Sequence, residues 1–264
     1  MTSLRNSVNT TVDNNENLSQ NAAMKQTTRL GVLTPSSNTA LEPLTSLLAG
    51  AVPGCSAHFS RFKVTEIALT EQALGQFDDE KILAAAELLA DAKVDVIGWS
   101  GTAAGWLGFD ADRRLIERIR DRTGIAATTA VLALNELLAL RGIERIALVT
   151  PYTADVQQRI VENYARLGIE VVAERHLDIR VNHAFALVDP EQLRNMMREV
   201  ADARPQAITT FCTNLRAAQM AESVEAELGI PLLDTVSTTV WGQLRAAGAD
   251  PSVVRGWGQL FSWQ

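Results

Sequence analysis

The chain repeats itself, and this repeat limits the folds that it can adopt. Residues 29–35 (Arg-Leu-Gly-Val-Leu-Thr-Pro) reappear 116 positions later as residues 145–151 (Arg-Ile-Ala-Leu-Val-Thr-Pro). Residues 95–102 (Asp-Val-Ile-Gly-Trp-Ser-Gly-Thr) match residues 206–213 (Gln-Ala-Ile-Thr-Thr-Phe-Cys-Thr) at an offset of 111, and a third match, Gly-Ile-Ala against Gly-Ile-Pro, follows at an offset of 105. Three matches in the same order, with slowly drifting offsets, indicate an internal duplication whose loops have changed length.

Short apolar runs rich in β-branched residues alternate with amphipathic segments along the chain, which is typical of parallel sheets covered by helices. The sequence therefore predicts an α/β fold of two similar Rossmann-like lobes, each with a parallel four-stranded sheet, related by a pseudo-twofold axis. The predicted strands are 29–33, 56–64, 94–100, 125–129, 145–150, 170–178, 206–210 and 231–235. The predicted helices are 78–92, 110–122, 131–141, 153–167, 190–203 and 214–228.

The repeat also suggests where the chain divides. We expect a disordered tail over residues 1–28, which are rich in Asn, Thr and Ser, an N-terminal lobe over 29–142 and a C-terminal lobe over 143–236. The remaining residues, 237–264, are expected to pack back onto the N-terminal lobe. The last segment is apolar for an exposed tail, so it is expected to cover either the body of the protein or a neighbouring subunit, and a homo-oligomer stays open.

Composition excludes several classes of protein. The net charge of −7 and the pI of about 5.1 argue against nucleic-acid binding. We expect a cytoplasmic protein, because no apolar run is long enough for a membrane span and the first 28 residues carry no apolar signal segment. The three histidines and two cysteines lack metal-site or disulfide spacing, and no glycine-rich nucleotide motif occurs, so neither a metal nor a cofactor is expected.

The ends of four predicted strands carry the polar residues that suggest a function. In parallel α/β sheets, ligands bind at the carboxyl ends of the strands. The loops at 34–38, 100–102, 150–152 and 211–213 occupy such ends, and a pseudo-twofold arrangement brings all four to one cleft. They offer hydroxyl and amide groups without Lys or Arg, together with helix N-termini, which suits a small carboxylate.

Cys212 is the residue of this cleft with the most chemistry. It follows a predicted strand and precedes a predicted helix, so nearby backbone N–H groups are expected to favour the thiolate. The repeat places Gly101 at the equivalent position of the other lobe, facing it across the ligand. The alternative for Cys212 is a buried, inert cysteine. The other polar candidates also have structural alternatives as helix caps, turn residues or a half-buried aromatic: Asn38, Thr102, Tyr152, Asn182 and Thr213.

The segment Thr34-Pro-Ser-Ser-Asn-Thr39, together with the Gly101-Thr102, Thr-Pro-Tyr152 and Cys212 loops, resembles the aspartate/glutamate racemase superfamily in its maleate cis-trans isomerase and arylmalonate decarboxylase branch. The resemblance extends from Arg29 to about Gly248. It implies two cysteines that flank the substrate without a cofactor, of which this chain keeps only the second.

The two branches imply different roles for the same positions. In maleate isomerases the first cysteine attacks the double bond, and the residues matching Asn38, Tyr152 and Asn182 bind carboxylates. In arylmalonate decarboxylases a Gly-Thr pair, as in Gly101-Thr102, takes the first position, and the remaining cysteine protonates a carbanion. Those enzymes usually have Ser where this chain has Ala103, which puts part of the oxyanion site in doubt.

The single thiol favours a cofactor-independent lyase that decarboxylates a substituted malonate or a similar small dicarboxylate. In this interpretation Cys212 donates the proton, while Thr102, Tyr152 and the backbone near Thr213 stabilise an enediolate. Ser37, Asn38 and Asn182 would bind a carboxylate. The alternatives are a maleate-type isomerase or an Asp/Glu-type racemase, and a non-catalytic dicarboxylate-binding protein. Gly101→Cys is expected to add racemase or isomerase activity.

Overall fold

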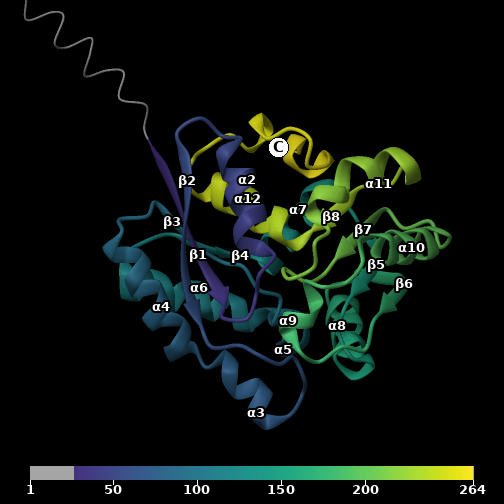
Figure 1. The fold of residues 1–264 in the computed structure, drawn as a ribbon, viewed down its shortest axis with the longest axis horizontal. Coiled ribbons are helices and arrows are strands. Elements are labelled where there is room, and N and C mark those ends of the chain that lie inside the picture. The colour runs from purple at the N-terminus through teal and green to yellow at the C-terminus, as the bar shows by residue number, and fades with distance from the viewer. Residues whose placement is uncertain (1–26, 264) are drawn as a thin grey trace, which may run out of the picture.

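The computed structural model describes residues 27–263 and contains two parallel four-stranded sheets flanked by helices (Figure 1). All but the last two residues of the predicted tail, 1–28, lie outside the described residues. The strand orders are β2-β1-β3-β4 and β6-β5-β7-β8, so both sheets have the same topology. The strands are β1 (Thr28–Pro35), β2 (Cys55–Phe62), β3 (Val96–Trp99), β4 (Ala127–Thr129), β5 (Arg145–Thr150), β6 (Glu170–His176), β7 (Ala207–Thr210) and β8 (Leu232–Asp234). The predicted fold class and all eight strands are confirmed.

Equivalent backbone hydrogen bonds show that the two lobes share one framework. The N–H of Ser100 donates to the carbonyl of Leu33 at 3.2 Å, and the N–H of Phe211 donates to the carbonyl of Val149 at 3.0 Å. The two donors are 111 positions apart, which is the offset of the sequence repeat. The residue after each donor is therefore held at the carboxyl edge of its own sheet, where ligands bind in parallel α/β folds.

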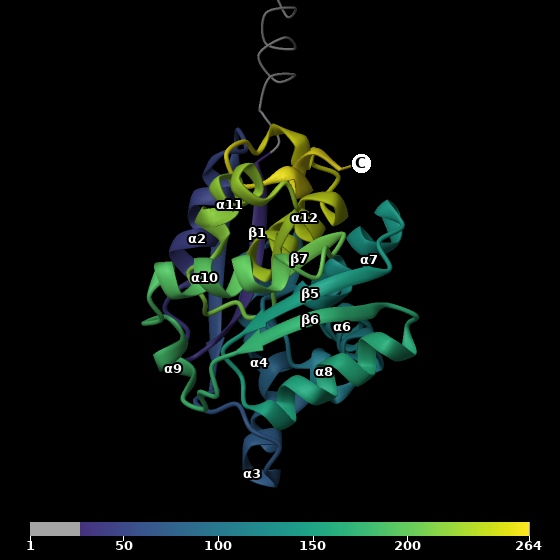
Figure 2. The ribbon, with the colours of Figure 1, turned by 90° about the vertical axis from the view of Figure 1, so that its right-hand side faces the viewer.

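Helices cover both sheets (Figures 1 and 2), and no described helix is long and apolar enough to cross a membrane. The residues at the start of α10 are those expected at a helix N-terminus. Asp189 caps α10 by accepting from the N–H of Glu191 at 2.7 Å, and Pro190 occupies its first turn. The helices are α2 (Leu41–Gly50), α3 (Glu71–Leu74), α4 (Asp79–Asp91), α5 (Ala104–Leu107), α6 (Phe109–Thr123), α7 (Ala130–Arg141), α8 (Ala154–Arg166), α9 (Asn182–Phe185), α10 (Pro190–Ala201), α11 (Ala221–Leu228) and α12 (Thr235–Ala246).

The helix predicted over 214–228 begins later than expected. The α-helix starts at Ala221, after a 3₁₀ turn over Ala218–Met220, and residues 211–217 form an irregular loop. Asn214 explains this difference, because its side-chain oxygen accepts hydrogen bonds from backbone N–H groups of the other lobe. A loop that crosses between lobes to make such contacts cannot also start a helix at its first residue.

Helix α12 follows the last strand of the second sheet but lies against the first sheet. The Gln243 side chain donates to the carbonyl of Gly31 in β1 at 2.7 Å, and the Thr238 hydroxyl donates to the carbonyl of Ala130 in α7 at 2.9 Å. The helix therefore connects the two lobes across the back of the cleft. Beyond it, the Trp263 side chain is buried, and its carbonyl accepts a hydrogen bond from the Trp241 indole. The division at residue 142 stays a prediction.

Candidate active site

Six of the eight predicted site residues line one cavity at the carboxyl ends of both sheets, where the two lobes meet. They are Gly101, Thr102, Tyr152, Asn182, Cys212 and Thr213. Ser37 and Asn38 lie behind this lining. Among the described residues of the lining, none is Lys, Arg, Asp or Glu, and the described chain has no cluster of three or more His, Cys, Asp or Glu that could hold a metal. The cavity is therefore neutral, and the polar groups of its lining residues are hydroxyls, amides, indole N–H groups and one thiol.

Residues 64–67 of the N-terminal lobe form a strap that lines one side of the cavity through Val64 and Ile67. Glu66 forms an antiparallel bridge with Val181 of the C-terminal lobe. The N–H of Ile67 donates to the carbonyl of Arg180, and a second hydrogen bond joins the segments on the other side of the bridge, both at 3.0 Å. The cavity leaves about 20 Å³ for the centre of a water molecule, which is room for about one water. A dicarboxylate is larger than this, so the lining must move before one fits.

Cys212 is 3% exposed and keeps its proton at neutral pH. Burial, the largest effect, raises the pKa of the thiol to about 12, although hydrogen bonds from the Tyr152 hydroxyl and the Asn214 backbone act in the opposite direction. The N–H of Asn214 points at the sulfur from 3.4 Å. The expected preference for thiolate is therefore outweighed by desolvation, since the sulfur lies in a buried loop and not at a helix N-terminus. The geometry suits a proton donor.

Tyr152 and Thr102 form the second element of the cavity. Their hydroxyl oxygens are 2.6 Å apart, and both side chains are buried. Burial, and secondly the neighbouring Cys212, raise the pKa of Tyr152 well above its usual value, so the phenol stays neutral. The rings of Trp106 and Phe185 contact the Tyr152 ring edge-on, with centroids 5.3 and 5.7 Å away. This packing fixes the direction of the hydroxyl, as an oxyanion donor requires.

Asn38 acts in this structure as a helix cap. Its side-chain oxygen accepts from the N–H groups of Ala40 and Leu41, each at 3.0 Å, at the start of α2. Its amide nitrogen donates to the Thr213 hydroxyl at 3.3 Å, and that hydroxyl donates in turn to the carbonyl of Ser100 at 3.0 Å. Asn38 and Thr213 therefore tie the lobes together beside the cavity, and the structural alternative considered for Asn38 is present in the geometry.

Asn182 does line the cavity, but it begins α9 and does not belong to a turn. Its amide nitrogen donates to the Ser37 hydroxyl at 2.7 Å, and Ser37 donates to the carbonyl of Val64 in the strap at 2.6 Å. Asn182 and Ser37 thus join the C-terminal lobe, the Pro-Ser-Ser-Asn loop and the strap. The same hydrogen bonds therefore hold the strap against the C-terminal lobe and orient the Asn182 amide.

Asn214 is a residue of the site that the sequence did not single out. It is 1% exposed, and its side-chain oxygen accepts from the N–H groups of Thr39 and Ala40 at 3.0 and 3.2 Å. Its amide nitrogen donates to the carbonyl of Asn182 at 2.6 Å. The position next to the Cys212-Thr213 pair was the available signal, but the repeat has Ala103 there and gives no hint of a contact between lobes.

A side chain at position 101 would collide with a neighbouring ring, which the sequence did not reveal. A Cβ atom at this position would lie 2.1 Å from Cζ2 and 2.4 Å from Cη2 of the Trp99 indole. Trp99 is 1% exposed, and its ring contacts Phe62 with centroids 5.0 Å apart. The indole therefore occupies the place of the missing first thiol. Gly101→Cys therefore requires the Trp99 ring to move, and the expected gain of racemase or isomerase activity stays a prediction.

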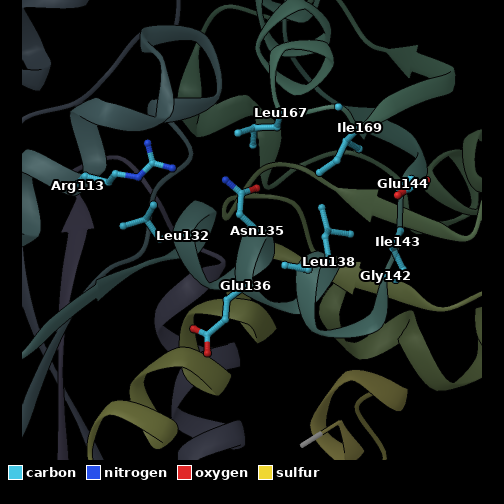
Figure 3. A pocket seen from close by; sticks show the side chains of 12 residues that line it. Arg113, Leu132, Asn135, Glu136, Leu138, Gly142, Ile143, Glu144, Leu167 and Ile169 are labelled. Atoms are coloured by element: carbon cyan, nitrogen blue, oxygen red, sulfur yellow. The ribbon is translucent and has the colours of Figure 1, made fainter.

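A larger hollow lies elsewhere, beside α7 (Figure 3), with a volume of about 630 Å³. Leucine and isoleucine are five of its twelve lining residues, the charged side chains are those of Arg113, Glu136 and Glu144, and the Asn135 amide points into it. It contains none of the predicted site residues. This larger hollow is therefore not where the thiol and the hydroxyl pair meet, and the smaller cavity between the lobes is the candidate active site.

Comparison with known proteins agrees with this geometry. The family model described as arylmalonate decarboxylase matches residues 18–261. The chain belongs to the arylmalonate decarboxylase family. Among the relatives of this family member, a maleate isomerase from Pseudomonas putida is 30% identical over 251 residues, covering 90% of this chain and 99% of the relative. An arylmalonate decarboxylase from Bordetella bronchiseptica is 30% identical over 186 residues, covering 69% of this chain and 77% of the relative.

A solved structure extends the comparison to three dimensions. A cysteine-to-alanine variant of the maleate isomerase from Pseudomonas putida S16, crystallised with maleate, superimposes with a TM-score of 0.83 at 28% identity, covering 90% of this chain and 98% of that chain. The predicted superfamily branch is thus confirmed. The relatives include enzymes of two classes, isomerases and a decarboxylase.

Proposed function

We propose that this family member is a cofactor-independent decarboxylase of a substituted malonate, with Cys212 as the proton donor. The observation that carries the proposal is the single protonated thiol of the cavity, which shares the cavity with Gly101, where the Trp99 indole occupies the space that a Cβ atom would need. Racemisation by two bases requires an acid and a base on opposite faces of the substrate. Decarboxylation requires only one acid.

The proposed reaction uses the groups that line the cavity. The bond between the α-carbon and one carboxyl group breaks, CO₂ leaves, and the electron pair remains on an enediolate. The hydroxyls of Thr102 and Tyr152 and the backbone N–H near Thr213 stabilise the new negative charge. The Cys212 S–H then delivers its proton to the α-carbon from one face, and the thiolate regains a proton from solvent.

The retained carboxylate needs an anchor among neutral groups. Asn182 lines the cavity and is held by Ser37, so its amide is placed to receive the carboxylate when the strap opens and recloses. Asn38 acts indirectly in this proposal, since it holds Thr213 and the start of α2. The site thus fits a small dicarboxylate without a cation, because helix N-termini and amide groups can bind carboxylates.

Maleate cis-trans isomerisation is the second candidate. Its support is the maleate isomerase relative, which matches nearly its whole length, and the presence of Asn38, Tyr152 and Asn182. Covalent addition to a double bond needs a thiolate. Burial keeps Cys212 protonated, which disfavours that step in the closed cavity.

The test is turnover of a panel of diacids by the purified protein: phenylmalonate, methylmalonate, maleate and aspartate, with CO₂ release and product identity measured. The proposal expects CO₂ from a malonate, and one deuterium at the α-carbon of the product in D₂O. Cys212→Ala should abolish CO₂ release. Cys55→Ala is the matched control, because the other cysteine lies outside the cavity and should be dispensable. Fumarate from maleate without CO₂ would overturn the proposal, and binding without any turnover would favour a dicarboxylate-binding protein.

A further inference from the structure

Gly101 is not required by its backbone conformation. Nine glycines of the described chain have positive φ angles, and Gly101 is not among them, so an L-residue could adopt its backbone. The three heavy atoms nearest to a Cβ at this position all belong to the Trp99 ring, at 2.1 to 2.5 Å. What excludes a side chain from position 101 is therefore the indole.

The second lobe has a smaller residue at the position equivalent to Trp99 and a larger residue at the position equivalent to Gly101. Trp99 pairs with Thr129 at the end of β3, and Thr210 pairs with Asp234 at the end of β7. Trp99 and Thr210 are thus equivalent, and each precedes by two residues the position that faces the cavity. The C-terminal lobe combines a small Thr210 with Cys212, whereas the N-terminal lobe combines a large indole with a glycine.

We propose that Trp99 is a specificity-determining residue: its indole fills the first-lobe thiol position and closes the substrate face opposite Cys212 to water and to bulky substituents. This inference rests on the proposed function, because that function defines which face of the substrate Cys212 protonates. Trp99 lines the cavity, as do Gly101 and Cys212, and Phe62 supports the ring from behind. An apolar wall on this face lets only the thiol protonate the enediolate, so the product forms as one enantiomer.

The contact between the Trp99 indole and a side chain at position 101 is tested by thermal denaturation of a double-mutant cycle, which needs no substrate turnover. Gly101→Ala should lower Tm by about 3–10 °C in the wild-type background, because it overpacks a buried site. In the Trp99→Thr background, which copies the second lobe, the same change should lower Tm by less than about 2 °C. Trp99→Phe is the milder background in case the threonine variant folds poorly. An equal loss in both backgrounds would overturn the proposal.

The specificity part is tested with methyl-, phenyl- and naphthylmalonate. In a Cys212→Ala background, calorimetric titration should show that Trp99→Thr raises the affinity for naphthylmalonate relative to methylmalonate about tenfold or more. In the protein with Cys212 intact, Trp99→Thr should lower the enantiomeric excess of the product from a prochiral malonate. Unchanged relative affinities would overturn the specificity role. If the Tm cycle and the binding titrations give the expected results but no malonate is turned over, the decarboxylase proposal is refuted and the role of Trp99 stands.

Discussion

Tyr152→Phe is the most informative single substitution in this site. It removes one oxygen atom and keeps the ring that contacts Trp106 and Phe185, so the shape of the cavity is preserved. The lost hydroxyl is 2.6 Å from the Thr102 hydroxyl and also reaches the thiol of Cys212. If Tyr152 stabilises the enediolate, its effect belongs to the transition state and not to substrate binding.

The expected magnitudes follow from these contacts. Loss of one oxyanion donor from a closed site lowers kcat by about 10²–10³. KM should stay within about threefold, because an interaction made only in the transition state lowers kcat and kcat/KM equally. The buried Thr102 hydroxyl loses its hydrogen-bond partner, which costs about 1–3 kcal/mol and lowers Tm by about 2–10 °C for a chain of this size.

The assay is initial-rate CO₂ release against substrate concentration, with thermal denaturation measured on the same preparation. Tyr164→Phe is the matched control, because Tyr164 is the only other tyrosine, is fully buried, and has a hydroxyl without a partner within the described structure. This control should keep its kcat and its Tm. A Tyr152→Phe enzyme with normal kcat and a raised KM would refute the oxyanion role and make Tyr152 a ground-state binding residue.

Three further predictions follow from buried polar groups. Because the active form of Cys212 is protonated and its pKa is about 12, kcat/KM should not fall between pH 7 and 10, and a decline with an apparent pKa near 8 would contradict its role as the acid. Burial raises the pKa of Asp112 to about 7, so the folded chain keeps a proton that the unfolded chain loses near pH 4. The free energy of unfolding should therefore fall as pH rises from about 4 to 7 and level off above, and Asp112→Asn, which keeps an acceptor for Thr129, should raise Tm at pH 8 more than at pH 4. Asn214→Ala removes two hydrogen bonds between the lobes and should lower Tm by several degrees in thermal denaturation, whereas an unchanged Tm would show that the α12 contacts suffice.

The fold was predictable because its signals are local and repeated. Several strands, such as β3 and β5, are short apolar runs, and the repeat shows that two such sets fold alike. Helix α12 was missed because every residue from Thr235 to Leu244 is buried, and its Thr, Ser and Gln side chains do not mark a solvent-exposed face. The start of α11 was misplaced because a contact between lobes, made by Asn214, decides the path of the chain there.

The site was predictable in its members but less so in their roles. Strand ends indicated which loops meet, and six of eight residues reached the cavity. The pKa of Cys212 depends on how deeply the loop is buried, which no spacing reveals. Asn38 caps α2, and only distances distinguish that role from a ligand contact.

The strap that pairs with residues 180–182 imposes an order on product release. With room for about one water, the cavity must widen to hold a carboxylic acid, and if the strap is the part that moves, the acid stays until the hydrogen bonds made by Ile67 and Asn182 break. A turnover then contains two separate barriers, one chemical and one mechanical. In a fast enzyme of this design, solvent viscosity limits the rate, and the amide hydrogens of these two residues report each opening.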